Sequence, residues 1–233
     1  MFPLHDDNPA RSNPYITIII ILSCVLIFLW QLSLGKYAQN AVFALGMIPA
    51  VVFNIKQLSP DLVTVPALAT FFTSMFLHGG WMHLIGNMLY LWIFGNNVED
   101  AMGHKRFILF YLICGVAAAL TQAIPNPDSV IPMIGASGAI SGVLGAYWLL
   151  YPHARVLIVI PIGFYLHTTR IKAGWVLGFW FILQIVSSIM SADQQGGVAW
   201  GAHIGGFVAG IALIPFFKYR HVRLFTPARG NYR

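Results

Sequence analysis

Six continuous apolar segments constrain this chain more than any other feature. Each is 17 to 20 residues long, close to the length that an α-helix needs to cross the hydrocarbon core of a bilayer. They occupy residues 15–34, 78–94, 107–123, 134–151, 174–190 and 198–217. Only 9% of the residues are charged, too few to cover a water-facing surface. The segments also lack the alternating pattern of a membrane β-barrel. The sequence therefore predicts an all-α polytopic membrane protein with six transmembrane helices.

The basic residues predict how these helices are oriented. Eleven of the 13 Lys and Arg residues lie in the two tails, the second-to-third connection and the fourth-to-fifth connection. Because basic residues concentrate on the cytoplasmic side, both termini are expected in the cytoplasm. With no organellar transit segment, the expected location is the bacterial cytoplasmic (inner) membrane. The expected divisions are an N-terminal tail at 1–14, a six-helix membrane domain at 15–217 and a basic C-terminal tail at 218–233.

The positions of the acidic residues disfavour several kinds of chemistry. All seven lie in tails or connections, whereas an intramembrane aspartyl protease or a proton-coupled transporter needs buried carboxylates. His83 is followed by Leu-Ile-Gly-Asn, so the Glu of a zinc-binding His-Glu-x-x-His motif is missing. Cys24 and Cys114 lie in separate apolar segments and form no metal-ligand pattern. We therefore expect no metal and no cofactor. The net charge of +6 reflects basic residues at one membrane face, so no nucleic-acid partner is expected.

Two polar residues within the apolar segments are candidates for nucleophilic catalysis. Ser137 lies in a Gly-Ala-Ser-Gly motif at the start of the fourth segment, where free backbone N–H groups favour a developing oxyanion. His203 lies near the start of the sixth segment, which enters from the same non-cytoplasmic side, and histidine is the usual base for a serine nucleophile. Each has a structural alternative, because serines often pack between membrane helices and buried histidines often form core hydrogen bonds.

The spacing of small residues predicts that these two candidates lie close together. They recur at a spacing of four on the fourth and sixth segments, which favours close backbone-to-backbone packing of the two helices. Those expected to support this packing and the approach to Ser137 are Gly135, Gly138, Ala202, Gly206 and Gly210. Since no intramembrane acid is available to orient His203, the predicted unit is a Ser–His dyad.

A third group of polar residues lies on the second segment. His83 and Asn87 are four residues apart, so a helix places them on one face. His78 lies near the same non-cytoplasmic end. Neutral donors there would stabilise an oxyanion, and they are equally suited to hydrogen bonds between helices.

Together these motifs resemble the rhomboid family of intramembrane serine proteases. The resemblance extends over residues 76–88, Glu99 with residues 103–107, the Gly-Ala-Ser-Gly motif at 135–138, and Ala202-His203 with Gly206 and Gly210. It implies a six-transmembrane-helix rhomboid-like bundle in which Ser137 is the nucleophile and His203 the general base. It further implies an oxyanion hole formed by the backbone N–H of Ser137 and the side chains of His83 and Asn87.

The implied function is an intramembrane serine endopeptidase. It would hydrolyse a peptide bond in or near the transmembrane segment of membrane-protein substrates, with membrane lipids as its surroundings. The alternative is a catalytically silent rhomboid-like protein that binds and routes membrane clients. A small-solute transporter is disfavoured by the lack of intramembrane acids. The oligomeric state is left open.

Two features fall outside the motifs. Ser141 stands where some family members carry an aromatic residue that supports the catalytic histidine. Support for His203 is then either looser or supplied by Trp200 or another aromatic. The connections at 35–70 and 152–173 contain apolar stretches too short to span, and we expect them to lie partly at the membrane interface.

Overall fold

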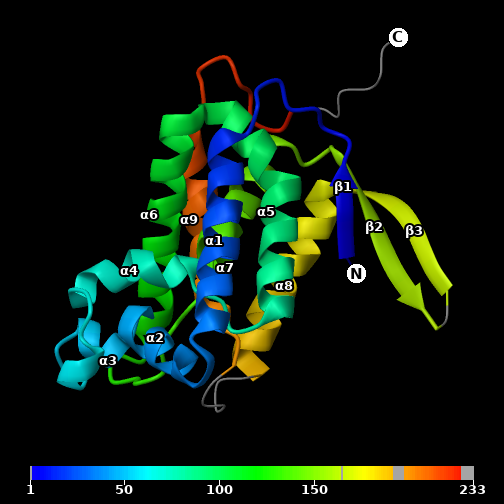
Figure 1. Ribbon diagram of the computed structural model, residues 1–233. Helices are drawn as coiled ribbons and strands as arrows, with labels where there is room; N and C mark the ends of the chain where they lie inside the picture. The colour runs from blue at the N-terminus through cyan, green and yellow to red at the C-terminus, as the bar shows by residue number, and fades with distance from the viewer. Residues whose placement is uncertain (1, 164, 191–196, 227–233) are drawn as a thin grey trace, which may run out of the picture.

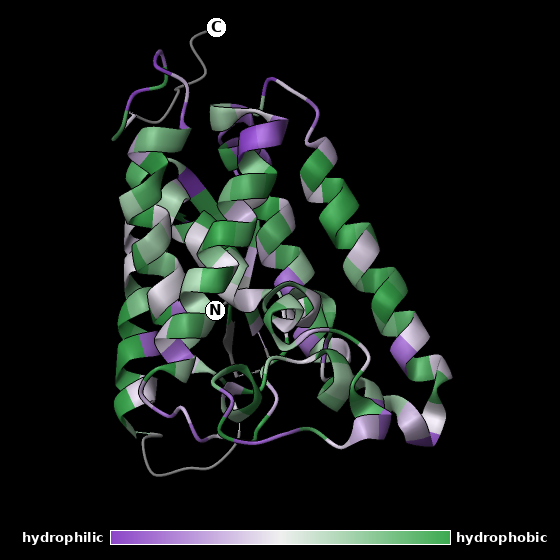
Figure 2. Ribbon diagram, turned by 90° about the vertical axis from the view of Figure 1, so that its left-hand side faces the viewer, coloured by the Kyte–Doolittle hydropathy of each residue, from purple (hydrophilic) through white to green (hydrophobic). Residues whose placement is uncertain are grey.

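A computed structural model describes residues 2–163, 165–190 and 197–226, and its core is a bundle of long helices (Figure 1). The helices that correspond to the six apolar segments are α1 (Tyr15–Ser33), α5 (Trp81–Met102), α6 (His104–Ala123), α7 (Ser137–Leu150), α8 (Ala173–Met190) and α9 (Trp200–Phe217). By length and composition, α1, α6, α8 and α9 can each cross a membrane. Figure 2 shows that these helices are predominantly hydrophobic along their length. The predicted six-helix membrane bundle is confirmed.

Helix α7 lies inside the bundle, in contact with α5, α6, α8 and α9. It has 14 residues, most of them buried, and at 1.5 Å per residue it extends about 21 Å. This is shorter than the hydrocarbon core, which is about 30 Å thick. If the C-terminal end of α7 reaches one membrane surface, its first residue, Ser137, therefore lies below the opposite surface.

The loop that precedes α7 is held by backbone hydrogen bonds to another part of the protein. Met133 and Met47 exchange backbone hydrogen bonds of 2.8 and 3.0 Å, and the N–H of Gly135 donates to the carbonyl of Ser74 at 2.9 Å. Irregular backbone at membrane depth is tolerated where protein satisfies its polar groups. The partners come from the long connection after α1, which holds α2 (Ala38–Leu45), α3 (Pro49–Val52), α4 (Thr70–Thr73) and short 3₁₀ turns. This connection contacts the loop before α7 and occupies the lower left of Figure 1.

Glycines bring α7 and α9 into backbone contact. A Cβ atom at Gly206 would lie 2.0 Å from the carbonyl oxygen of Gly138, and one at Gly210 would lie 1.9 Å from that of Gly142. No larger residue fits at either position without a shift of backbone. The two helices are therefore fixed against each other along the predicted small-residue faces.

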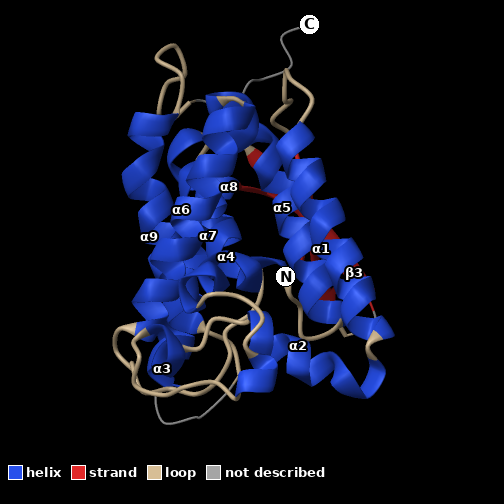
Figure 3. Cartoon of the chain, turned by 60° about the vertical axis from the view of Figure 1, so that its left-hand side comes forward, coloured by secondary structure: helices blue, strands red, loops and turns tan. Residues whose placement is uncertain are grey.

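A small sheet extends from the bundle and was not predicted. It is antiparallel, in the order β1-β2-β3, and is formed by β1 (Phe2–Asp6), β2 (Arg155–Ile162) and β3 (Tyr165–Lys172) (Figure 1). In Figure 3 the helices cover most of the strands, which are red. Val156 and Ile158 of β2 are fully buried. A short continuous apolar run does not distinguish a strand from an interfacial segment, and β1 lies about 150 residues from its partner in the sequence. The connection at 152–173 is therefore largely a β-hairpin, and part of the 1–14 tail is its third strand.

Candidate active site

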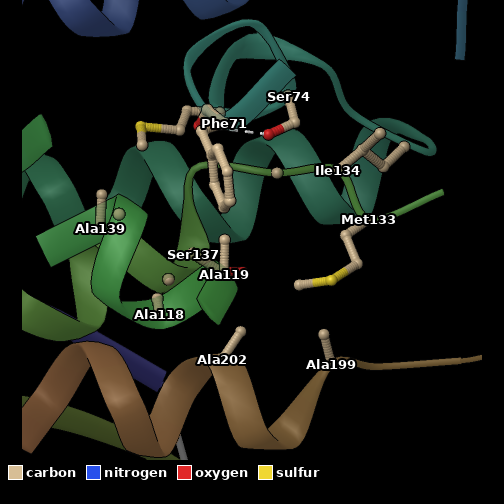
Figure 4. A pocket seen from close by; sticks show the side chains of 14 residues that line it. Phe71, Ser74, Ala118, Ala119, Met133, Ile134, Ser137, Ala139, Ala199 and Ala202 are labelled. Atoms are coloured by element: carbon tan, nitrogen blue, oxygen red, sulfur yellow. Dashed lines mark hydrogen bonds between the residues drawn. The ribbon is translucent and has the colours of Figure 1, made fainter. Parts of the chain in front are cut away.

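Ser137 and His203 are hydrogen-bonded to each other. The Ser137 Oγ atom lies 2.9 Å from His203 Nε2. Ser137 is the first residue of α7 and His203 lies in the first turn of α9, so the glycine contact between these helices sets the distance. Figure 4 shows Ser137 at the start of α7, across from Ala202 and Ala199 at the beginning of α9. The structure thus brings together the two residues predicted to form a dyad.

The other imidazole nitrogen of His203 has a partner that the sequence analysis missed. His203 Nδ1 lies 2.8 Å from Oε1 of Gln184 on α8, and Gln184 Nε2 donates to the carbonyl of Trp180 at 3.0 Å. The available signal was a carboxamide inside a transmembrane segment, since such residues are functional candidates by default.

Aromatic rings also surround His203. The ring centroids of Trp180 and Trp200 each lie 6.0 Å from the centroid of the imidazole. Ser141, where the sequence resemblance implies an aromatic in some family members, donates its hydroxyl hydrogen to the carbonyl of Ser137 at 2.7 Å. The support around His203 is therefore divided between α8 and α9.

His83 faces the same loop from α5. The backbone N–H of Gly79 donates to His83 Nδ1 at 3.2 Å, so the ring proton of neutral His83 lies on Nε2. A Cβ atom at Gly135 would lie 2.7 Å from His83 Nε2 and 3.7 Å from Ser137 Oγ. Both groups thus border Gly135, whose φ of +120° also disfavours a side chain. Glycine at this position lets a donor approach the serine.

Asn87 lies one turn further along α5 and is 8% exposed. Its Nδ2 has no hydrogen-bond partner among the described residues. A buried amide donor without a partner costs free energy of folding, which marks it as a candidate for binding something else. The start of α7 has no side-chain cap in the described structure, and its first N–H groups have no acceptor within the helix.

A cavity of about 40 Å³ lies beside Ser137. Its walls include Phe71 and Ser74 from the α4 region, Met133 and Ile134 from the preceding loop, and Ala202 from α9 (Figure 4). This volume accommodates a water molecule. A peptide segment would need more room than this cavity provides.

Comparison with known proteins identifies the family. A Rhomboid domain matches residues 66–220, about two thirds of the chain. The chain belongs to the rhomboid family. This confirms the resemblance seen in the sequence, and the rhomboid match covers α5 to α9, the helices that carry Ser137, His203, His83, Asn87 and Gln184.

Several rhomboid proteins are similar to this chain. Rhomboid protein 1, mitochondrial, of Saccharomyces cerevisiae is 29% identical over 75% of this chain and 52% of its own length. Rhomboid protease GluP of Bacillus subtilis is 37% identical over 60% of this chain and 25% of its own length. Rhomboid protease GlpG of Salmonella newport is 26% identical over 91% of this chain and 66% of its own length. The match to this chain thus covers from a quarter to two thirds of the length of these rhomboid relatives.

Proposed function

We propose that this rhomboid is an intramembrane serine endopeptidase that cleaves a peptide bond in or near the transmembrane segment of membrane proteins. The observation that carries the proposal is the 2.9 Å contact between Ser137 Oγ and His203 Nε2 at the start of a short, buried helix. Relatives named rhomboid proteases support the same reaction class. No metal or cofactor is needed for it.

The mechanism follows from the positions of the donors and acceptors. His203 Nε2 takes the hydroxyl proton as Ser137 Oγ bonds to the substrate carbonyl carbon. The resulting oxyanion is stabilised by the N–H of Ser137, by His83 Nε2 and by Asn87 Nδ2. The C–N bond then breaks, and the amine leaves with the proton from His203. Water next gives a proton to His203 as its oxygen bonds to the acyl carbon. The bond between Ser137 Oγ and that carbon then breaks, His203 returns the proton to Ser137 Oγ, and the product leaves with a new carboxyl group.

The depth of Ser137 determines which substrates are suitable. In an intact helix each carbonyl oxygen accepts a hydrogen bond and is shielded by the next turn, so the substrate helix must unwind locally. Gly, Pro and small residues near the cleavage site lower this cost. We place the protein in the bacterial cytoplasmic membrane with both termini cytoplasmic, so that Ser137 is reached from the opposite side. Membrane lipids and transmembrane protein substrates are its partners in this proposal.

Cleavage of a reconstituted substrate tests the proposal. The purified protein is placed in vesicles with a single-span peptide that carries Gly and Pro in the outer third of its helix. We expect cleavage by the unaltered protein, none by Ser137→Ala, and nearly full activity for the matched control Ser141→Ala. Cleavage by Ser137→Ala would contradict the assignment. Stable peptide binding without cleavage by the folded, unaltered protein would favour the client-binding alternative.

A further inference from the structure

The geometry around His203 points to a third member of the reacting unit. We propose that Gln184 is a positioning residue, which holds the proton on His203 Nδ1 and aims Nε2 at Ser137. The inference rests on the proposed function and deepens it, because it assigns the orientation of the base to a residue on a different helix, α8.

The burial of Gln184 is unusual for its helix. Its exposed fraction is 5%, whereas its neighbours Leu183 and Ile185 are 43% and 37% exposed. Along α8 the other buried residues are Ala173, Val176 and Leu177, all apolar. A carboxamide inside a membrane bundle is costly unless both its ends are hydrogen-bonded. In this structure both ends are bonded, and one of the partners is the imidazole of His203.

The bond to Trp180 fixes which end of the amide faces His203. Because Gln184 Nε2 donates to the carbonyl of Trp180, Oε1 is the atom 2.8 Å from His203 Nδ1. Rotating the amide by half a turn would place Oε1 against another carbonyl oxygen. An amide oxygen accepts and cannot donate, so His203 Nδ1 must carry the ring proton. His203 Nε2 then has a free lone pair toward the Ser137 hydroxyl, as a general base requires.

A neutral amide performs part of the work of the carboxylate in a Ser–His–Asp triad. It selects the tautomer and the direction of the ring, and it places no negative charge beside the imidazolium that forms during attack. In triad enzymes the rate falls steeply when the catalytic histidine takes the wrong tautomer. Loss of Gln184 should therefore lower the rate of the chemical step. Substrate binding should be nearly unaffected, because Gln184 contacts the base and not the cavity wall.

Paired substitutions separate positioning from packing. Gln184→Met keeps the length of the side chain and removes the acceptor, and we expect kcat to fall about 10- to 100-fold with KM unchanged. Gln184→Glu keeps an oxygen acceptor and should recover kcat to within about fivefold of the unaltered protein. The controls are Leu183→Met on the exposed face of α8 and Gln122→Met, which removes an amide that accepts from the N–H of Ala202. Both should stay within about twofold.

The readouts are kcat and KM for a transmembrane peptide, and the rate at which a fluorophosphonate probe labels Ser137. Unchanged kcat in Gln184→Met would overturn the proposal, as would equal losses in the Met and Glu variants. If Gln184→Met does not fold, Gln184→Asn, whose amide is too short to reach, takes its place with the same expected loss. Failure of the unaltered protein to cleave or to label would instead count against the proposed function, so the two failures are distinguishable.

Discussion

The two ends of α7 are built differently. At its C-terminal end, the carbonyls of Leu149 and Leu150 accept hydrogen bonds from the N–H groups of Phe225 and Thr226, each at 2.9 Å. Tyr147 near that end donates its hydroxyl hydrogen to the buried carboxyl of Asp6 on β1 at 2.5 Å. At the N-terminal end the helix has no side-chain cap in the described structure, and Ser137 borders a small cavity.

The difference shows how one short helix combines stability with reactivity. Its far end and its glycine face are fixed by the C-terminal segment, β1 and α9, so contacts remote from the reacting groups help to hold Ser137 in place. The near end can then keep unpaired donors and space for water. Stability and reactivity should therefore respond to different substitutions.

The largest difference between an effect on activity and an effect on stability is expected for substitutions of two asparagines of α5. Asn87→Ala removes the buried Nδ2 that has no partner among the described residues. We expect kcat to fall about 10²- to 10³-fold, as for loss of an oxyanion donor, with no loss of thermal stability. The matched control is Asn97→Ala, further along α5, which removes a 2.7 Å hydrogen bond from Asn97 Nδ2 to the carbonyl of Asn8. It should lower the melting temperature and leave kcat nearly unchanged. Equal behaviour of the two variants would contradict the separation.

A smaller effect is expected at the glycine contact in the middle of the helix. Gly210→Ala places a Cβ atom 1.9 Å from the carbonyl oxygen of Gly142, and we expect the free energy of unfolding to fall by about 2–3 kcal/mol. Gly178→Ala on α8 is the control, because its Cβ would lie 3.7 Å from Trp148 Nε1, an ordinary contact. Unfolding in detergent micelles measures both. If Gly210→Ala is as stable as Gly178→Ala, the close packing of α7 on α9 is not what fixes Ser137.

The smallest effect is expected at the far end and depends on pH. Burial raises the pKa of Asp6 from its ordinary 3.8 to about 6, against smaller opposing effects of the Tyr147 hydrogen bond and of His5. The native state thus binds this proton more tightly than the unfolded chain, so the stabilisation is present at low pH and is lost as pH rises from about 4 through about 6. The shift corresponds to roughly 3 kcal/mol at pH 8, and because the substitution also alters the hydrogen bond with Tyr147, Asp6→Asn should recover about 1 kcal/mol of it at pH 8 and much less at pH 4.

Melting curves of Asp6→Asn at several pH values provide the check. A stabilisation that is independent of pH would contradict the buried-carboxyl explanation. The kcat of this variant should match that of the unaltered protein, because Asp6 is bonded to the end of α7 that lies away from Ser137.

The sequence alone predicted the parts of the structure that depend on local pattern. Apolar segments of membrane-spanning length identified the six helices, and small residues four apart indicated that the helices of Ser137 and His203 pack together. The sequence did not predict where the loop before α7 ends. The apolar segment begins at 134, whereas the helix begins at Ser137. Where it begins depends on backbone partners such as Ser74 in a distant connection.

Two further features could not be predicted because they depend on long-range placement. Pairing of β1 with β2 joins segments separated by four helices of the bundle, α1, α5, α6 and α7. Gln184 meets His203 only because α8 is rotated so that one carboxamide among exposed apolar residues faces α9. The apolar pattern of α8 fixes neither that rotation nor the partner.

Chemical labelling tests the central claim, that His203 activates Ser137, without requiring a known substrate. The purified protein is treated with a fluorophosphonate probe in detergent, and mass spectrometry identifies the labelled residue in the unaltered protein and in His203→Ala. We predict labelling at Ser137 that is lost in His203→Ala, while both proteins melt at similar temperatures. Labelling at Ser137 that persists at the same rate without His203, or labelling of a different serine, would contradict the account.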